Sequence, residues 1–91
     1  MENTEIIEIL EAAKVHLPKY FGMCQMVEKA IEDSTIHPLN RAHCKELVMC
    51  ELRKDYTGAR DIKCHWYTIG DKDSRRDHFN RTIDRLKFQT Q

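Results

Sequence analysis

The chain has 91 residues, which is enough for one small domain spanning residues 1–91. Hydrophobic residues make up 41% and charged residues 33% of the sequence, a balance that excludes both a disordered tail of one charge sign and a membrane-embedded protein. A domain of this size buries only about 60% of the surface of its unfolded chain. Its core is therefore thin, and we expect oligomerisation to complete it.

The formal net charge of zero is the sum of two unlike halves. Residues 1–52 carry five basic and nine acidic side chains, a net charge of −4. Residues 53–91 carry ten basic and six acidic side chains, a net charge of +4. Proteins that coat duplex nucleic acid are basic overall. This division of charge therefore favours a small anionic ligand that binds the basic half, or self-association in which the basic half of one copy meets the acidic half of another.

The N-terminus predicts a cytoplasmic protein. Residues 1–5 are acidic, whereas a signal peptide begins with a basic region, and no apolar run approaches the length of a membrane span. We therefore expect no membrane partner. The four cysteines are predicted to be free thiols, because apolar residues flank most of them and the cytosol is reducing. They are Cys24, Cys44, Cys50 and Cys64.

Apolar residues spaced three and four apart predict a first helix from Thr4 to about Leu17, ended by Pro18. Its apolar face consists of Ile6, Ile7, Leu10, Ala13 and Leu17. A second helix is predicted from about Phe21 to Asp33, with a start after Gly22 as the alternative because glycine disfavours a helix interior. Its apolar face consists of Met23, Met26, Val27, Ala30 and Ile31, with Cys24 beside them. A loop is predicted from Asp33 to Pro38.

A third helix is predicted from Pro38 to about Lys54, since proline suits the first position of a helix. One side of it carries Leu39, Ala42, His43, Leu47 and Cys50. Around this side spread Cys44, Val48, Glu51 and Leu52. This apolar arc is wide and indicates contacts on two sides, one of them with another subunit.

Residues 62–69 alternate apolar and polar side chains and are rich in β-branched and aromatic residues, which predicts one short extended segment. A last helix is predicted to begin with Asp73 or Ser74 as its cap. Its apolar face consists of Phe79, Ile83 and Leu86, with Phe88 close by. The predicted fold is thus mainly α: about four helices in a small bundle, with one short extended segment, completed by oligomerisation.

The spacing of reactive residues favours neither a metal site nor an enzyme. There is no Cys-x-x-Cys and no His-x-x-x-His, and adjacent pairs such as Cys64 and His65 point apart on a strand. There is also no glycine-rich phosphate loop and no Gly-x-Ser-x-Gly motif. We therefore expect no catalytic residues, no metal and no cofactor.

Arginines and lysines alternate with aromatic residues in the basic half of the chain. Arginine presents a planar fork to phosphate oxygens, and aromatic rings stack on bases. This combination predicts a nucleotide or single-stranded nucleic-acid site, with phosphates held by Arg60, Lys63, Arg75 and Arg76 and bases stacked on Tyr56, Trp66 or Tyr67. Two alternatives stay open: a solvated basic helix face, or a basic surface that pairs with the acidic half of a neighbouring subunit.

Four short motifs resemble a pattern common in small proteins of tailed bacteriophages. They are Ile6-Ile7-x-x-Leu10-x-x-Ala13, Gly22-Met23-Cys24-x-x-Val27-x-x-Ala30, Trp66-Tyr67 and Arg76-x-x-Phe79-x-x-x-Ile83-x-x-Leu86. The motifs span much of the chain, but the third predicted helix has no counterpart in the pattern.

The resemblance implies a phage accessory protein that disarms a host defence from the host cytoplasm. Such proteins include homo-oligomeric sponges that bind a nucleotide immune signal at subunit interfaces without cleaving it, and inhibitors that bind a host defence protein directly. The predicted function is the first, with a nucleotide or oligonucleotide signal as partner. A direct inhibitor or adaptor is the alternative, and a DNA- or RNA-binding module is the third.

Overall fold

The structure is a computed structural model that describes residues 2–19, 22–55 and 72–90. These residues form four α-helices: α1 (Asn3–Lys14), α2 (Met23–Glu32), α3 (Arg41–Lys54) and α4 (Lys72–Thr90), with a short 3₁₀ turn, η1 (Pro38–Asn40), before α3. No strand occurs in the described ranges. The prediction of a mainly helical fold is confirmed. The predicted extended segment, residues 62–69, lies outside the described residues.

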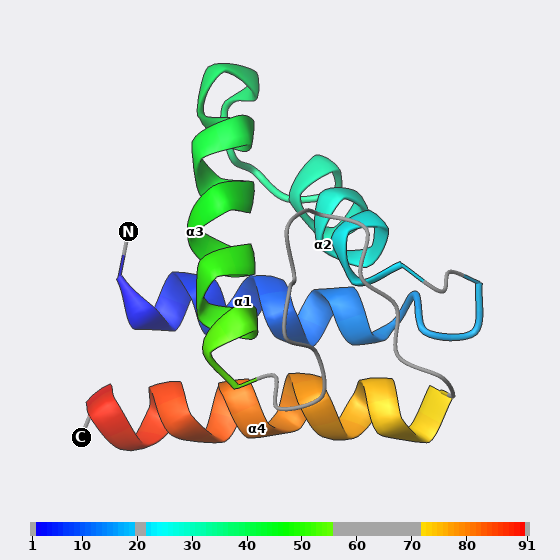
Figure 1. Ribbon diagram of the computed structural model, residues 1–91. Coiled ribbons are helices and arrows are strands. Elements are labelled where there is room, and N and C mark those ends of the chain that lie inside the picture. Colours follow the sequence, from blue (N-terminus) through cyan, green and yellow to red (C-terminus); the bar gives the residue numbers. More distant parts are fainter. Residues whose placement is uncertain (1, 20–21, 56–71, 91) are drawn as a thin grey trace.

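α1 and α4 form one layer of the fold, and α2 and α3 pack across it (Figure 1). α1 and α4 lie side by side and run in opposite directions. α2 packs on α1, and α3 packs on α2 and crosses α1 so that its C-terminal end meets α4. Each helix therefore buries one face against the others, as a small domain with a thin core requires.

The first two helices follow their predicted patterns closely. α1 ends at Lys14 rather than Leu17, and the next residues continue as hydrogen-bonded turns, with the backbone N–H of Leu17 donating to the oxygen of Lys14 at 3.2 Å. Its buried face includes Ile9, which the prediction left out, whereas Ile7 is only partly buried. α2 begins directly after Gly22, the alternative of its two predicted starts, and all six of its predicted apolar residues are buried.

The wide apolar arc predicted for the third helix is only partly buried. Four of its residues, Leu39, Ala42, His43 and Cys50, are exposed, and Leu47 is half-buried. The residues that α3 buries are instead Cys44, Val48, Met49 and Leu52. The helix is apolar on two sides, so periodicity alone could not choose between them. The side that includes Met49 faces the core.

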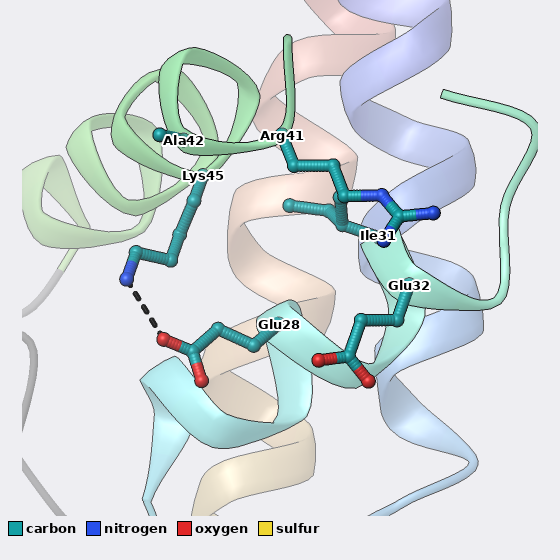
Figure 2. Close-up of a pocket in the computed structure, with 6 residues that line it drawn as sticks. All are labelled: Glu28, Ile31, Glu32, Arg41, Ala42 and Lys45. Atoms are coloured by element: carbon teal, nitrogen blue, oxygen red, sulfur yellow. Dashed lines mark hydrogen bonds and ion pairs between the residues drawn. The ribbon is translucent and has the colours of Figure 1, made fainter. Parts of the chain in front are cut away.

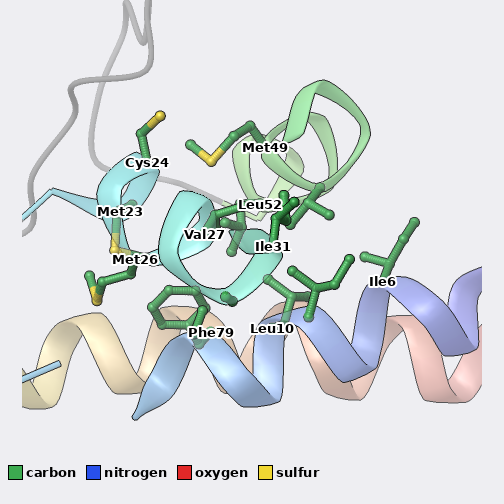
Figure 3. Packing of buried hydrophobic residues seen from close by; sticks show 14 of the residues in the cluster. Ile6, Leu10, Met23, Cys24, Met26, Val27, Ile31, Met49, Leu52 and Phe79 are labelled. Carbon is green, nitrogen blue, oxygen red and sulfur yellow. The ribbon is translucent and has the colours of Figure 1, made fainter. Parts of the chain in front are cut away.

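α4 begins at Lys72, so Asp73 and Ser74 lie inside its first turn and are not its cap. Asp73 still suits this position, because carboxylates stabilise the positive end of the helix dipole. The predicted core residues Phe79, Ile83 and Leu86 are buried, whereas Phe88 is 80% exposed. His78 and Thr82 are buried as well. Figure 3 shows side chains of all four helices meeting in one cluster, with Phe79 near Leu10.

A cluster of charged groups ties the C-terminal end of α3 to α4. The Nε atom of Arg85 lies 3.0 Å from both carboxylate oxygens of Asp55. Its Nη2 atom donates to the backbone oxygen of Glu51 at 3.1 Å and to the carboxylate of Glu51 at 2.8 Å. Lys54 donates to the same carboxylate at 3.0 Å. Hydrogen bonds between oppositely charged groups are stronger than those between neutral groups, so this cluster helps to hold the end of α3 on α4.

Candidate functional site

The predicted ligand site falls mainly outside the described residues. Five of its seven members lie there: Tyr56, Arg60, Lys63, Trp66 and Tyr67. The other two, Arg75 and Arg76, lie in the first turns of α4. Because successive residues of a helix point about 100° apart, these two arginines face different surroundings.

Arg75 points into the protein. Its side chain is only 3% exposed, and its Nη2 atom donates to the backbone oxygen of Leu17 at 3.4 Å. This bond joins the start of α4 to the turn that follows α1. Arg75 thus has a structural role in holding the two helices of the layer together.

Arg76 points to solvent. Its Nη1 atom lies 3.2 Å from a carboxylate oxygen of Asp73, one turn earlier on the same helix. An exposed pair of this spacing contributes only about 0.3–0.5 kcal/mol. The guanidinium of Arg76 is thus held only weakly by Asp73 and stays accessible to solvent.

A cleft lies between α2 and α3 (Figure 2). Its volume is about 210 Å³, and it is lined by Glu28, Ile31, Glu32, Arg41, Ala42 and Lys45. Lys45 reaches across it to Glu28, with 2.7 Å between Nζ and the carboxylate, and this hydrogen bond raises the pKa of Lys45. Small-molecule sites usually enclose about 300–1,000 Å³. The cleft is thus small, and the carboxylate of Glu28 already accepts a hydrogen bond from the ammonium group of Lys45.

A larger hollow of about 480 Å³ lies along α4. It is lined by Ser74, Asp77, Asn80, Arg81 and Asp84. Two carboxylates face one guanidinium here, so the hollow repels a phosphate more than it attracts one. Neither this hollow nor the cleft between α2 and α3 suits a nucleotide within a single chain.

The described cysteines are thiols, as predicted. Burial raises the pKa of Cys24 to about 11, and its Sγ atom lies 3.6 Å from the carboxylate of Glu28. Burial also raises the pKa of Cys44. A thiol must lose its proton to act as a nucleophile, so these two are poorly suited to that role. Cys50 is exposed on α3, and Cys64 lies outside the described residues.

In the described part of the chain, no group of three or more His, Cys, Asp or Glu residues is arranged to hold a metal ion. None of its helices combines the length and the apolar character that crossing a membrane requires.

The sequence placed apolar residues on two sides of the third predicted helix and indicated contacts on both. It did not say that Met49 would be buried and that Leu39, Ala42 and Cys50 would be exposed, because this depends on how α3 packs against α2 and α1.

Comparisons with protein-family models, with curated proteins and with solved structures find no match to this chain. Its function must therefore be inferred from its own residues.

Proposed function

We propose that this chain is a small, non-catalytic phage anti-defence protein that sequesters a nucleotide immune signal, or a short oligonucleotide, in the cytoplasm of the host. The observation that carries the proposal is the concentration of arginine, lysine and aromatic residues between residues 53 and 76. Guanidinium groups recognise phosphate oxygens, and aromatic rings stack on bases whatever their identity.

The hollows of the described chain support capture between subunits rather than within one. The cleft between α2 and α3 is small and mixed in charge, and the hollow along α4 is lined by two carboxylates. A second copy would bring its own cations to the ligand. Sequestration without cleavage needs no activated nucleophile, which agrees with the raised pKa of the Cys24 thiol.

The test is calorimetric titration of the purified protein with a panel of linear and cyclic nucleotides. We expect binding that weakens at least about tenfold in Arg76→Ala, because a charge-assisted hydrogen bond to phosphate contributes about 1.5–3 kcal/mol. The matched control is Lys87→Ala, which removes an equal charge from an exposed position near the other end of α4. Arg75 is unsuitable for this test, because it is buried and its loss would disturb the fold.

Recovery of the ligand intact after binding is expected, whereas its conversion to product would contradict sequestration. A complete lack of binding and of thermal stabilisation across the panel would contradict nucleotide capture itself. Affinity for long nucleic acid that falls steeply with added salt would instead indicate a DNA- or RNA-binding module.

The second candidate is an inhibitor or adaptor that binds a host defence protein directly. Two large apolar side chains favour it: Phe88 on α4 is 80% exposed and Val15 after α1 is 74% exposed. Exposed aromatic residues often anchor protein interfaces. This candidate predicts a stoichiometric host protein that copurifies with the wild type and is lost in Phe88→Asp. Equal recovery with both proteins would count against it.

A further inference from the structure

The cleft between α2 and α3 is lined by two acidic and two basic side chains. Glu28 and Glu32 are one turn apart on α2, and Arg41 and Lys45 are one turn apart on α3, so each helix presents its two charges on one side. Lys45 and Glu28 are in direct contact, with 2.7 Å between Nζ and the carboxylate. Among the six residues drawn in Figure 2, this is the only pair joined by a dashed line. Arg41 and Glu32 are thus an open pair, two opposite charges in one cleft that do not bind each other.

Arg41 has hydrogen-bonding capacity that the described chain does not use. Its side chain is half-buried in the wall of the cleft, and its Nε atom is buried with no hydrogen-bond partner among the described residues. Buried N–H groups of proteins nearly always have an acceptor, because an unpaired one is costly. A guanidinium group binds a carboxylate through two parallel hydrogen bonds. This half of the open pair therefore suits a carboxylate from outside the chain.

The other half of the open pair suits a cation. Glu32 is exposed, and its Oε2 atom lies 3.3 Å from Nζ of Lys29, one turn earlier on α2. Exposed pairs of this spacing are weak, so the carboxylate stays accessible. The helix termini reinforce the pattern, since Glu32 is the last residue of α2 and Arg41 is the first of α3. A helix is partly negative at its C-terminus and partly positive at its N-terminus. A cation is therefore favoured beside Glu32 and an anion beside Arg41.

We propose that this cleft binds a small free α-amino acid as its zwitterion, with the α-carboxylate on Arg41 and the α-ammonium group on Glu32. The four charged side chains sum to zero, so a ligand of one sign is attracted by some of them and repelled by the others. A zwitterion is attracted at both ends. Ile31 and Ala42 also line the cleft and can contact a short aliphatic side chain.

The size of the cleft limits the ligand. Its volume of about 210 Å³ equals the share of about seven water molecules in the liquid, which is room for roughly six to nine non-hydrogen atoms. Alanine, serine and valine fall in this range, whereas a nucleotide does not. The inference goes beyond nucleotide capture and does not rest on it. Its test contains no nucleotide, so each proposal can fail without the other.

The first experiment is a titration of the ¹⁵N-labelled full chain with alanine, serine and valine, followed by backbone amide chemical shifts. An open cleft should bind with a dissociation constant in the millimolar range, which a titration to about 50 mM covers. We expect saturable shifts concentrated in residues 28–32 and 41–45. N-acetylalanine lacks the ammonium group and alaninamide lacks the carboxylate, so each should bind at least about tenfold more weakly than alanine. No saturable shift, shifts centred elsewhere, or equal binding of either analogue would overturn the proposal.

The second experiment removes the charges of the open pair one at a time. Arg41→Gln and Glu32→Gln should each weaken alanine binding at least about tenfold. Neither residue belongs to the hydrophobic core, so the fold should survive, and circular dichroism verifies this. The matched controls are Lys87→Gln and Glu46→Gln, which remove the same charges at exposed positions that do not line the cleft. Arg41→Lys, which keeps the charge but not the planar fork, should bind alanine better than Arg41→Gln does. Equal affinities in the cleft variants and in their controls would contradict the assignment.

Discussion

His78 is a buried side chain whose protonation differs between the folded and the unfolded state. It is fully buried on α4, and burial, with a smaller effect from Arg81, lowers its pKa to about 4 from an ordinary value of 6.5. The folded protein therefore holds a neutral imidazole at pH values where the unfolded chain takes up a proton. This difference makes the stability of the fold depend on pH.

We predict that the free energy of unfolding falls as the pH drops from 7 to 5. Because the pKa of His78 is lower in the folded state, its contribution is complete above about pH 6.5 and is lost progressively toward pH 4. The loss between pH 7 and pH 5 should be about 2 kcal/mol. Urea denaturation at the two pH values measures it. His78→Gln, which does not titrate, should flatten this part of the profile, and an unchanged slope in that variant would contradict the assignment.

At the scale of elements, the meeting of α3 and α4 depends on Arg85. Its guanidinium is bound by the carboxylates of Asp55 and Glu51, all three side chains being more than 70% buried. Burial by itself would raise the pKa of Glu51, but hydrogen bonds from Arg85 and Lys54 outweigh this effect, and the pKa is lowered. The ion pair between Glu51 and Arg85 thus stabilises the folded state at pH values above the ordinary pKa of a carboxyl group. This stabilisation is lost as the pH falls through the lowered pKa of Glu51.

Arg85→Ala is predicted to destabilise the protein by about 2–4 kcal/mol, because two partly buried carboxylates lose the cation between them. Arg81→Ala, on the exposed side of the same helix, should cost no more than about 0.5 kcal/mol. Thermal or urea unfolding at neutral pH compares the two variants. Equal destabilisation would mean that the loss of an arginine from α4, and not this cluster, is responsible.

At the scale of the whole molecule, stability depends on one shared core. All four helices contribute to it, and Phe79 is fully buried within it. We predict that Phe79→Ala lowers the free energy of unfolding by about 3–5 kcal/mol, because truncation leaves a cavity in a thin core. Phe88→Ala, the same change at an 80% exposed position of α4, should cost less than about 0.5 kcal/mol. Similar losses in denaturant unfolding would show that Phe79 is not a core residue.

The helices could be predicted well where each had one apolar face. For α2, every residue of the predicted apolar face is buried, since Gly22 marks the start of the helix and apolar residues recur three and four positions apart along it. For α3 the sequence indicated apolar contacts on two sides, and packing against α2 and α1 decides which residues are buried. For the candidate site, the sequence could mark Arg75 and Arg76 as cations. It could not separate them, because their different burial depends on how α4 lies against α1.

The sequence by itself determined the helical class of this protein, since the period of its apolar residues needs no knowledge of neighbours. It also determined the division into an acidic and a basic half, which is a property of composition alone. Only the tertiary structure decided that Arg75 is internal, that Arg85 is bound by two carboxylates, and that α3 buries Met49 while Cys50 is exposed. These facts depend on contacts between residues far apart in the chain, and no local pattern encodes them.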